Sequence, residues 1–379
     1  MFKPLTILGA SARAAAFSAR RADFAPLAGD LFADVDLRHC CPAERVPDYP
    51  DGLMRVCTGM QPGSWIYTGA LENHPTLVDK LAAVRPLLGN GGHVLRQVRN
   101  PFRVYAALRR AGLACPEVRR EPDSLPCDGS WLRKPFRSAG GTRVTAWAGG
   151  DQSTQFTGRY YFQQRIEGQP CSAVFVAAAG EARLLGLTRQ IIGASWTGAS
   201  GFRYAGSIGP LEVDASARRA LKQIGQVLAQ QFKLTGLFGV DAILSAGTVW
   251  PVEVNPRYTA SIEILEWAFG MHAVQLHVDA CASALPGRLP SAAHVCCAKT
   301  ILFARRDLVV PWGLHEIGHD HFRACPWTAW PRMADVPEPG STVHAGRPIV
   351  TLLVRTTSEQ EALRELQARA ASLEALLYA

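Results

Sequence analysis

The stretch VEVNPRY, Val252–Tyr258, constrains the fold of this chain more than any other segment. Apolar residues alternate in it with Glu253, Asn255 and Arg257, and successive side chains of a β-strand point to opposite faces. A strand over this stretch therefore presents an acid, an amide and a guanidinium on one face. The guanidinium is a planar donor that suits a phosphate or a carboxylate.

The preceding segment GVDAILSAG predicts a hairpin with this strand. If 245–247 form its loop, Asp241 lies opposite Pro251, and Glu253 is its diagonal neighbour on the same face. Two carboxylates and the Asn255 amide gathered there repel unless a cation lies between them. Oxygen ligands suit Mg²⁺ or Mn²⁺, usually completed by phosphate oxygens. The alternative is a surface hairpin with a polar outer face.

Composition excludes several classes of protein. The 379 residues suit two to four domains, and 48% hydrophobic with 19% charged residues indicates a folded globular chain. The net charge of +8 comes mostly from arginine, without a long basic run, so no nucleic-acid partner is expected. Ten cysteines without CxxC spacing predict free thiols in a reducing cytoplasm. No apolar run is long enough for a signal peptide or a membrane span.

The N-terminal segment predicts a Rossmann-like start. A strand over 5–8 is followed by Gly9 and a helix over 12–21, and a second strand is expected near 28–31. Only one glycine lies in the turn, so the dinucleotide fingerprint is absent. Ser11 and Arg13 follow the first strand, and they face the crevice at the carboxyl ends of the strands. They are candidate substrate contacts.

Two further motifs suit a nucleotide. LRKPFRSAGG places Lys134 on a strand before a glycine loop, so that the ammonium and the loop N–H groups can hold phosphates from two sides. YFQQRIEGQ predicts a strand edge and a polar turn whose backbone could read an adenine edge. The alternative for Lys134 is an ordinary solvated lysine before a turn.

The order of these motifs resembles the ATP-grasp superfamily, which includes biotin carboxylase and the carboxylate–amine ligases. The resemblance covers roughly residues 95 to 270, and it implies an α/β fold with three parts. These are a Rossmann-like domain at 1–95, a two-lobed ATP-grasp domain at 96–290 with lobes near 125–185 and 186–290, and a small β-rich C-terminal domain with a terminal helix at 291–379.

The resemblance also implies residue roles. Lys134 would hold the α- and β-phosphates, and Arg257 would stabilise the transferred phosphoryl group or the acyl-phosphate. The phosphate loop, the adenine hinge and the metal ligands would be Gly140 and Gly141; Gln163, Gln164 and Ile166; and Asp241, Glu253 and Asn255. Many members carry a second phosphate lysine near the first linker, where this chain offers Arg99 or Arg103.

The implied activity is that of an ATP- and Mg²⁺-dependent ligase, which activates a carboxylate as an acyl-phosphate and joins it to an amine. Its partners would be small molecules, and a homodimer stays open. A weaker resemblance to members linked to methanopterin and methanofuran suggests amino-acid-like substrates and one-carbon cofactor biosynthesis. The alternatives are an ATP-grasp kinase, a carboxylase, or a nucleotide-binding protein without turnover. A Rossmann oxidoreductase is disfavoured by the missing glycines.

Three other features of the sequence contain residues that could belong to a site. The glycine- and aromatic-rich stretch 187–210 is interpreted as a loop, with Arg189 and Arg203 as candidate carboxylate binders or as surface residues. Glu263 is interpreted as a solvated helix residue rather than a base. The pattern His315-Glu316-x-x-His319 matches zinc proteases, but Gly318 interrupts the helix that this chemistry needs, and zinc is disfavoured.

Overall fold

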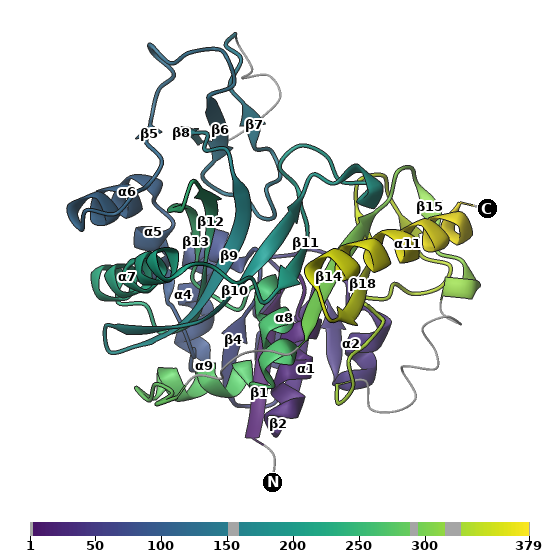
Figure 1. Ribbon diagram of the computed structural model, residues 1–379. Coiled ribbons are helices and arrows are strands. Elements are labelled where there is room, and N and C mark those ends of the chain that lie inside the picture. The colour runs from purple at the N-terminus through teal and green to yellow at the C-terminus, as the bar shows by residue number, and fades with distance from the viewer. Residues whose placement is uncertain (1–2, 151–158, 289–294, 315–326, 379) are drawn as a thin grey trace.

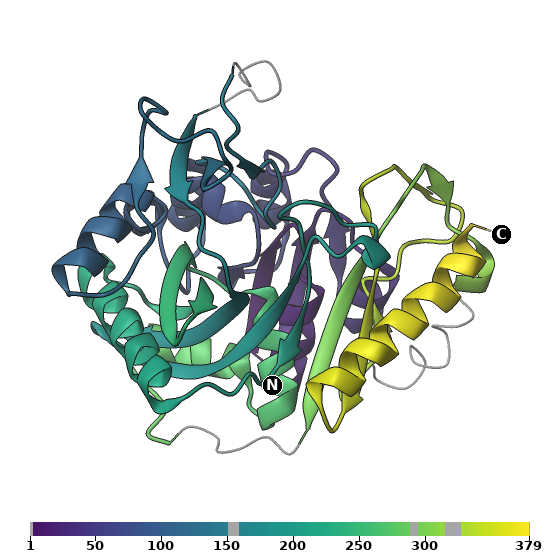
Figure 2. The same ribbon diagram turned by 45° about the horizontal axis from the view of Figure 1, so that its top comes forward.

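The computed structural model describes residues 3–150, 159–288, 295–314 and 327–378. Within these residues the chain is a mixed α/β structure with sheets of four, eight, two and four strands. Figures 1 and 2 show an N-terminal α/β unit, a small upper sheet, and a long central sheet that runs into the C-terminal segment. The predicted α/β class is confirmed.

The N-terminal unit is a parallel sheet in the order β3-β2-β1-β4. Its strands are β1 (Lys3–Gly9), β2 (Phe24–Asp30), β3 (Ala43–Arg45) and β4 (Ser64–Tyr67). Its helices are α1 (Arg13–Arg21), α2 (Val35–Cys40), α3 (Leu53–Gly59), the 3₁₀ turn η1 (Leu71–Asn73), α4 (Pro75–Val84) and α5 (Gly92–Val98). The predicted β-α-β start is confirmed, although the second strand begins earlier, at Phe24.

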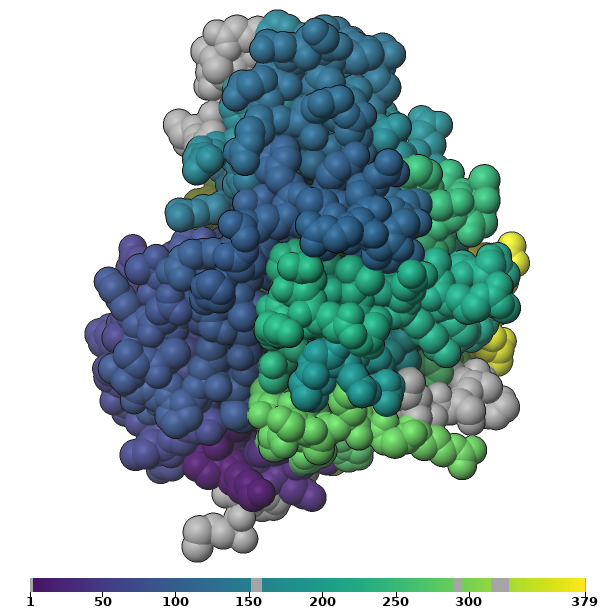
Figure 3. Space-filling model, turned by 90° about the vertical axis from the view of Figure 1, so that its left-hand side faces the viewer, coloured from purple at the N-terminus to yellow at the C-terminus, as the bar shows by residue number. Residues whose placement is uncertain are grey.

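Helix α6 (Pro101–Arg110) leads from this unit into the small upper sheet. The Asn100 side chain caps it by accepting from the backbone N–H groups of Phe102 and Arg103, and Pro101 occupies the first turn, where no N–H is needed. The antiparallel sheet has the order β5-β8-β6-β7. Its strands are β5 (Val118–Arg119), β6 (Trp131–Pro135), β7 (Thr145–Ala146) and β8 (Tyr160–Gln164). In Figure 3 this part of the chain forms a lobe above the central part.

The central sheet has the order β13-β12-β9-β10-β11-β14-β18-β16. Its strands are β9 (Gln169–Ala178), β10 (Glu181–Ile192), β11 (Tyr204–Gly209), β12 (Gly236–Ser245), β13 (Thr248–Asn255), β14 (Cys296–Phe303), β16 (Met333–Ala334) and β18 (Pro348–Thr356). Strands β14, β18 and β16 extend the sheet of the preceding domain through β11. The two domains predicted on either side of residue 290 therefore contribute strands to one sheet, and residue 290 itself lies outside the described residues. The predicted lobe boundary at 185 lies inside β10. A separate pair, β15 (Leu308–Val309) and β17 (Thr342–Val343), lies beside it.

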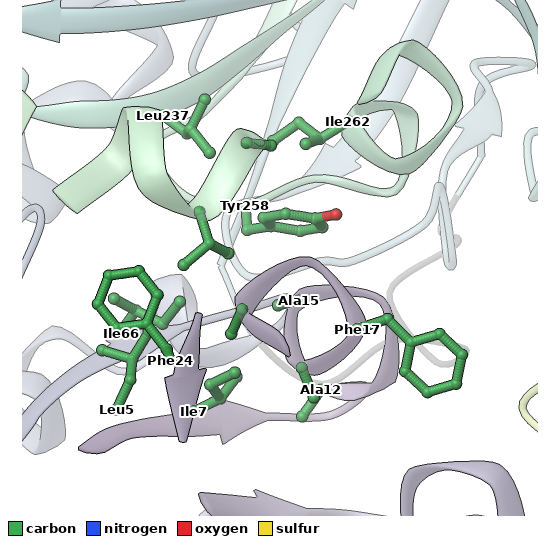
Figure 4. Packing of buried hydrophobic residues seen from close by; sticks show 14 of the residues in the cluster. Leu5, Ile7, Ala12, Ala15, Phe17, Phe24, Ile66, Leu237, Tyr258 and Ile262 are labelled. Atoms are coloured by element: carbon green, nitrogen blue, oxygen red, sulfur yellow. The ribbon is translucent and has the colours of Figure 1, made fainter. Parts of the chain in front are cut away.

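Helices cover both faces of the central sheet. Helices α7 (Ala215–Phe232) and α11 (Glu359–Leu377) pack on one face, and α8 (Ala260–Phe269) and α9 (Ala273–Cys281) pack on the other. The second face also meets α1 of the N-terminal unit. Figure 4 shows Tyr258 and Ile262 directly above Ala15 in the shared core. Burial of this apolar surface fixes the N-terminal unit against the central sheet.

The β12–β13 hairpin differs from the prediction in its register. Its loop is the two residues Ala246 and Gly247, both with positive φ, as hairpins of this length require. An irregularity after Asp241 adds one residue to β13, so Asp241 lies directly opposite Glu253 and not opposite Pro251. Without this bulge, Asp241 would lie opposite a residue whose side chain points to the other face of the hairpin. The prediction that Asp241, Glu253 and Asn255 share one face is therefore confirmed, but the bulge and not a three-residue loop accounts for it.

Candidate active site

The predicted metal ligands lie together on one face of the β12–β13 hairpin. The Asn255 Nδ2 atom donates to Asp241 Oδ2 at 3.0 Å, and Gln190 Nε2 of β10 donates to Asp241 Oδ1 at 3.0 Å. Glu253 is the direct cross-strand partner of Asp241. Among the described residues, no group of three or more His, Cys, Asp or Glu side chains could hold a metal ion. The face therefore offers two carboxylates and an amide, which leaves the other ligands of a hard cation to phosphate and water oxygens.

The two carboxylates differ in their electrostatics. Burial, together with the charge of Glu253, raises the pKa of Asp241 to about 6. Burial also acts to raise the pKa of Glu253, but the charges of Arg99 and Lys134 lower it below its usual value. A divalent cation between the carboxylates would relieve the repulsion that raises the Asp241 pKa, so the donor set fits Mg²⁺ or Mn²⁺.

Lys134 reaches this face from the small sheet. It lies on β6 and is only 7% exposed. Its Nζ atom donates to Gln163 Oε1 at 2.9 Å and to the carbonyl oxygen of Val252 at 3.2 Å. A buried lysine that contacts neutral oxygens has charge available for an anion. Because Lys134 is buried, it is not the ordinary solvated lysine that the sequence left as the alternative.

A cleft separates the small sheet from the edge of β13. Its lining includes the polar residues Arg99, Lys134, Ser138, Gln163 and Glu253, and its apolar walls come from α6, β5 and β8. Four of these five polar residues were predicted from the sequence to contact a nucleotide or its metal. The fold therefore gathers them around one opening between the two sheets.

Residues of the predicted adenine hinge already make hydrogen bonds within the protein. Gln163 uses its side chain to hold Lys134, and it also donates from Nε2 to Val252 O at 3.3 Å. The backbone N–H of Gln164 already donates to the carbonyl oxygen of Glu117 at 2.9 Å. Ile166 lies in the linker between β8 and β9. The adenine contact of these residues stays a prediction.

The glycine loop after Lys134 depends on the conformational freedom of two residues. Gly140 and Gly141 both have positive φ. The carbonyl oxygen of Gly140 accepts from the Tyr204 backbone N–H at 3.0 Å, and a Cβ atom on Gly141 would collide with the carbonyl oxygen of Phe202. The loop therefore lies against the segment before β11, and Gly141 cannot carry a side chain in this conformation.

Arg99, and not Arg103, belongs to the site. Its guanidinium pairs with Glu253 and donates from Nη1 to Val254 O at 3.3 Å. Its Nη2 atom donates to Asn73 Oδ1 at 3.2 Å and to the Ser138 carbonyl oxygen at 3.3 Å. Arg103 instead bonds to Gln97 on the exposed surface. The structure thus brings Arg99, and not Arg103, to the hairpin face, and a phosphate contact of Arg99 stays a prediction.

Arg257 lies beside Asn255 and meets the N-terminal unit. Its Nη2 atom is 2.7 Å from Oε1 of Glu72, a residue of η1 that is 1% exposed, and 3.3 Å from Asn255 Oδ1. Burial acts to lower the pKa of Arg257, but the charge of Glu72 raises it above its usual value. Sequence reasoning missed Glu72. Its signal was an acid shortly after the carboxyl end of an apolar parallel strand, where α/β proteins place ligand contacts.

Two of the predicted substrate residues lie at the first strand–helix turn. Ser11 is exposed. Arg13 is 2% exposed, and its guanidinium pairs with Glu263, with Asp335 and with Asp36. The structure therefore places Arg13 in a buried ion cluster and does not bring it to the hairpin face.

Glu263 corrects the expectation of a solvated residue. It is 1% exposed and contacts Arg13 and, at 2.7 Å, Lys299. Burial acts to raise its pKa, but the two cations lower it to about 2. The helix α8 packs here between β14 and α1, which explains why Glu263 is buried.

Arg189 and Arg203, the other predicted carboxylate binders, do not lie with the residues of the hairpin face. The segment 187–192 is the end of β10 and not a loop, and directly paired residues share a face. Arg189 pairs with Cys171 and Ile208 on the face opposite to Gln190, and its side chain contacts Glu359. Arg203 lies over the Phe303 ring at 4.3 Å. The pattern around His315 and His319 lies outside the described residues.

Comparisons with known proteins agree with this geometry. Residues 98–261 match the family model described as an ATP-grasp domain. An uncharacterised protein of Methanocaldococcus jannaschii is 21% identical over 280 residues, which cover 71% of this chain and 64% of that protein. The match thus spans less than two thirds of the relative's length.

Two solved structures share the fold. An L-amino acid ligase from Bacillus licheniformis has a TM-score of 0.71 at 15% identity, with 97% of this chain and 96% of that chain covered. The biotin carboxylase domain of the Hydrogenobacter thermophilus 2-oxoglutarate carboxylase, solved with MgADP, ADP and bicarbonate, has a TM-score of 0.70 at 12% identity, with 97% and 89% covered. The predicted resemblance is confirmed: residues 98–261 match an ATP-grasp domain, and the chain shares its fold with these two enzymes.

Among the described residues, every helix falls short of the length or the apolarity that a membrane span requires.

Proposed function

We propose that this protein is an ATP- and Mg²⁺-dependent ligase that joins a carboxylate to an amine through an acyl-phosphate. The observation that carries the proposal is that two cations, Arg99 and Lys134, line one cleft together with the Glu253 carboxylate. Arg99 pairs with Glu253, and Lys134 contacts the neighbouring β13 backbone at the Val252 carbonyl oxygen. Phosphates need this combination of fixed cations and metal-binding carboxylates.

The metal and the phosphates would share the hairpin face. Asp241, Glu253 and Asn255 would hold the magnesium, which neutralises phosphate charge when it is bound. Lys134 would contact the α- and β-phosphates, and Gly140 and Gly141 would lie over them. Arg99 would take the position of the second phosphate lysine. The adenine would lie by Gln163, Gln164 and Ile166.

The chemistry follows from the charges. A carboxylate oxygen of the substrate attacks the γ-phosphorus of ATP, and ADP leaves. The amine then attacks the acyl carbon, phosphate leaves, and an amide is formed. Arg257, beside Asn255, would stabilise the developing charge on the transferred phosphoryl group. The protein positions and screens the reactants, so it needs no nucleophile of its own.

The substrates we propose are amino-acid-like. The fold shared with an L-amino acid ligase is consistent with this class, and the resemblance to methanofuran- and methanopterin-linked members suggests a role in one-carbon cofactor biosynthesis. We place the reaction in the cytoplasm, because the cysteines of the described residues are free thiols.

Hydroxylamine provides a direct test, because it replaces the amine and converts an acyl-phosphate into a hydroxamate, which forms a coloured complex with ferric iron. The protein is incubated with MgATP, hydroxylamine and each of the twenty amino acids in turn, and ADP and hydroxamate are measured. Equal amounts of both with one class of carboxylate would support the ligase. ADP without hydroxamate but with a phosphorylated acceptor would indicate a kinase. Dependence of ADP formation on bicarbonate would indicate a carboxylase.

A further inference from the structure

We propose that Glu72 of the N-terminal unit is a positioning residue for the reaction, which holds Arg257 toward the transferred phosphoryl group and away from the metal ligands. This inference rests on the proposed function. Glu72 lies outside the matched ATP-grasp domain, which begins at residue 98, and no role was predicted for it from the sequence. It reaches the site because η1 follows β4 at the carboxyl edge of the parallel sheet.

The pairing of Glu72 and Arg257 is enclosed. Glu72 is 1% exposed, and the Arg257 side chain is 12% exposed. Neither carboxylate oxygen of Glu72 has a hydrogen bond within the described residues, so its buried charge is compensated by the 2.7 Å ion pair with Arg257 and by the nearby charge of Arg99. A buried charge without a partner is strongly unfavourable. The geometry therefore ties each of these two side chains to the other.

Arg257 has a second group of carboxylates within electrostatic reach. Glu253 attracts the same guanidinium, and Arg257 in turn lowers the pKa of Asp241. If Glu72 were neutral, Arg257 would be drawn toward the hairpin face and would occupy the space between the metal ligands. Glu72 thus keeps the Arg257 guanidinium beside the hairpin face. The carboxylates of that face then stay available to a cation.

The residue after Glu72 contributes to the same arrangement. Asn73 accepts from Arg99 Nη2 at 3.2 Å and donates from Nδ2 to the carbonyl oxygen of Ser138 at 3.0 Å. Two consecutive residues of one turn therefore hold the two arginines of the site. Gly69 lies at the same place, since a Cβ atom built on it would be 3.7 Å from Arg257 Cζ. The backbone of the N-terminal unit therefore borders the Arg257 guanidinium.

The test compares Glu72→Gln with the wild type and with Glu266→Gln. Glu266 is a matched control, because it is also 1% exposed and paired with an arginine, Arg21, at 3.0 Å, but lies away from the hairpin face. Calorimetry measures the Kd of MgADP alone and in the presence of aluminium fluoride, which mimics the transferring phosphoryl group. We expect Glu72→Gln to bind MgADP within about twofold of the wild type but to lose about tenfold or more of the tightening by aluminium fluoride.

The outcomes separate this inference from the proposed function. Tightening by aluminium fluoride in Glu72→Gln equal to that of the wild type and of Glu266→Gln would overturn the positioning role only. Failure of the wild type to bind MgADP would overturn the proposed function. If Glu72→Gln does not fold, Glu72→Asp decides, because its shorter side chain keeps the charge but cannot keep the 2.7 Å contact without movement. Reduced tightening in Glu72→Asp supports the role, and wild-type tightening contradicts it.

Discussion

The substitution Asp241→Asn should stabilise the ligand-free protein even though it removes a proposed metal ligand. The fold raises the pKa of Asp241 from 3.8 to about 6, because the carboxyl is buried and faces Glu253. This shift is about two pKa units, and each unit corresponds to about 1.4 kcal/mol, so the ionised carboxylate costs the folded state about 3 kcal/mol. Asparagine keeps the shape without the charge. It also loses one of the two acceptors that Gln190 and Asn255 use, which takes back about 1 kcal/mol.

The pH dependence of the gain follows from the same shift. A carboxyl with a raised pKa binds its proton more tightly in the folded state, so its contribution to stability is full below about pH 4 and is lost as the pH rises through about 6. The variant has no carboxyl group at position 241, so its stability does not fall as the pH rises through this pKa. The stability difference between variant and wild type should therefore be small or negative near pH 4 and should reach about 2 kcal/mol above pH 7.

Thermal unfolding of both proteins over this pH range, with EDTA present, measures the difference. At pH 7.5 we expect Asp241→Asn to melt several degrees above the wild type, and the gap should close at low pH. Addition of MgATP at about a hundred times its Kd should add about 2.7 kcal/mol to the wild type but much less to the variant, and so reverse the order. A variant that melts below the wild type at pH 7.5, with a gap independent of pH, would refute the electrostatic reasoning.

Three further substitutions test other parts of the site and of the fold. Lys134→Met should weaken MgATP binding about 10- to 100-fold in calorimetry, because a buried cation is lost, while the exposed Lys222→Met should leave the affinity unchanged. Gly141→Ala should weaken MgATP binding more than Gly140→Ala, since only its Cβ atom collides with a neighbouring backbone; equal effects would argue against this packing. Arg13→Met should cost about 3 to 5 kcal/mol in urea unfolding, because it leaves a cluster of buried carboxylates without their central cation, and a loss below 1 kcal/mol would contradict that description.

The sequence predicted the elements of the site better than their contacts. Alternation along VEVNPRY placed Glu253 and Asn255 on one face correctly, since a strand has a fixed period. The partner of Asp241 depended on a bulge, and Pro251 beside Val252 was a signal of it that the prediction did not use. Arg189 was predicted to lie in a loop, so the alternation of side chains along a strand was not applied to it. In β10 this alternation turns Arg189 to the face opposite to Gln190.

The contacts that join separate parts of the chain were beyond sequence reasoning. Glu72 meets Arg257 across 185 positions of the sequence, and this depends on how α1 and α8 pack the two units together. Arg13 was predicted to face a crevice because it follows β1, but its guanidinium lies in a buried ion cluster. Whether such a residue faces solvent or another part of the chain is decided by the C-terminal segment, whose Asp335 and Lys299 complete the buried cluster.

The binding of ATP to the wild type and to Glu253→Gln, measured by calorimetry with Mg²⁺ and with EDTA, tests the central claim most directly. Glutamine keeps the length of the side chain and removes the charge that would hold the metal and that pairs with Arg99. We predict that the wild type binds ATP much more tightly with Mg²⁺ than with EDTA, and that the variant loses most of this difference. Absence of ATP binding in the wild type, or Mg²⁺-dependent binding that the substitution leaves unchanged, would contradict an ATP site at the β12–β13 hairpin.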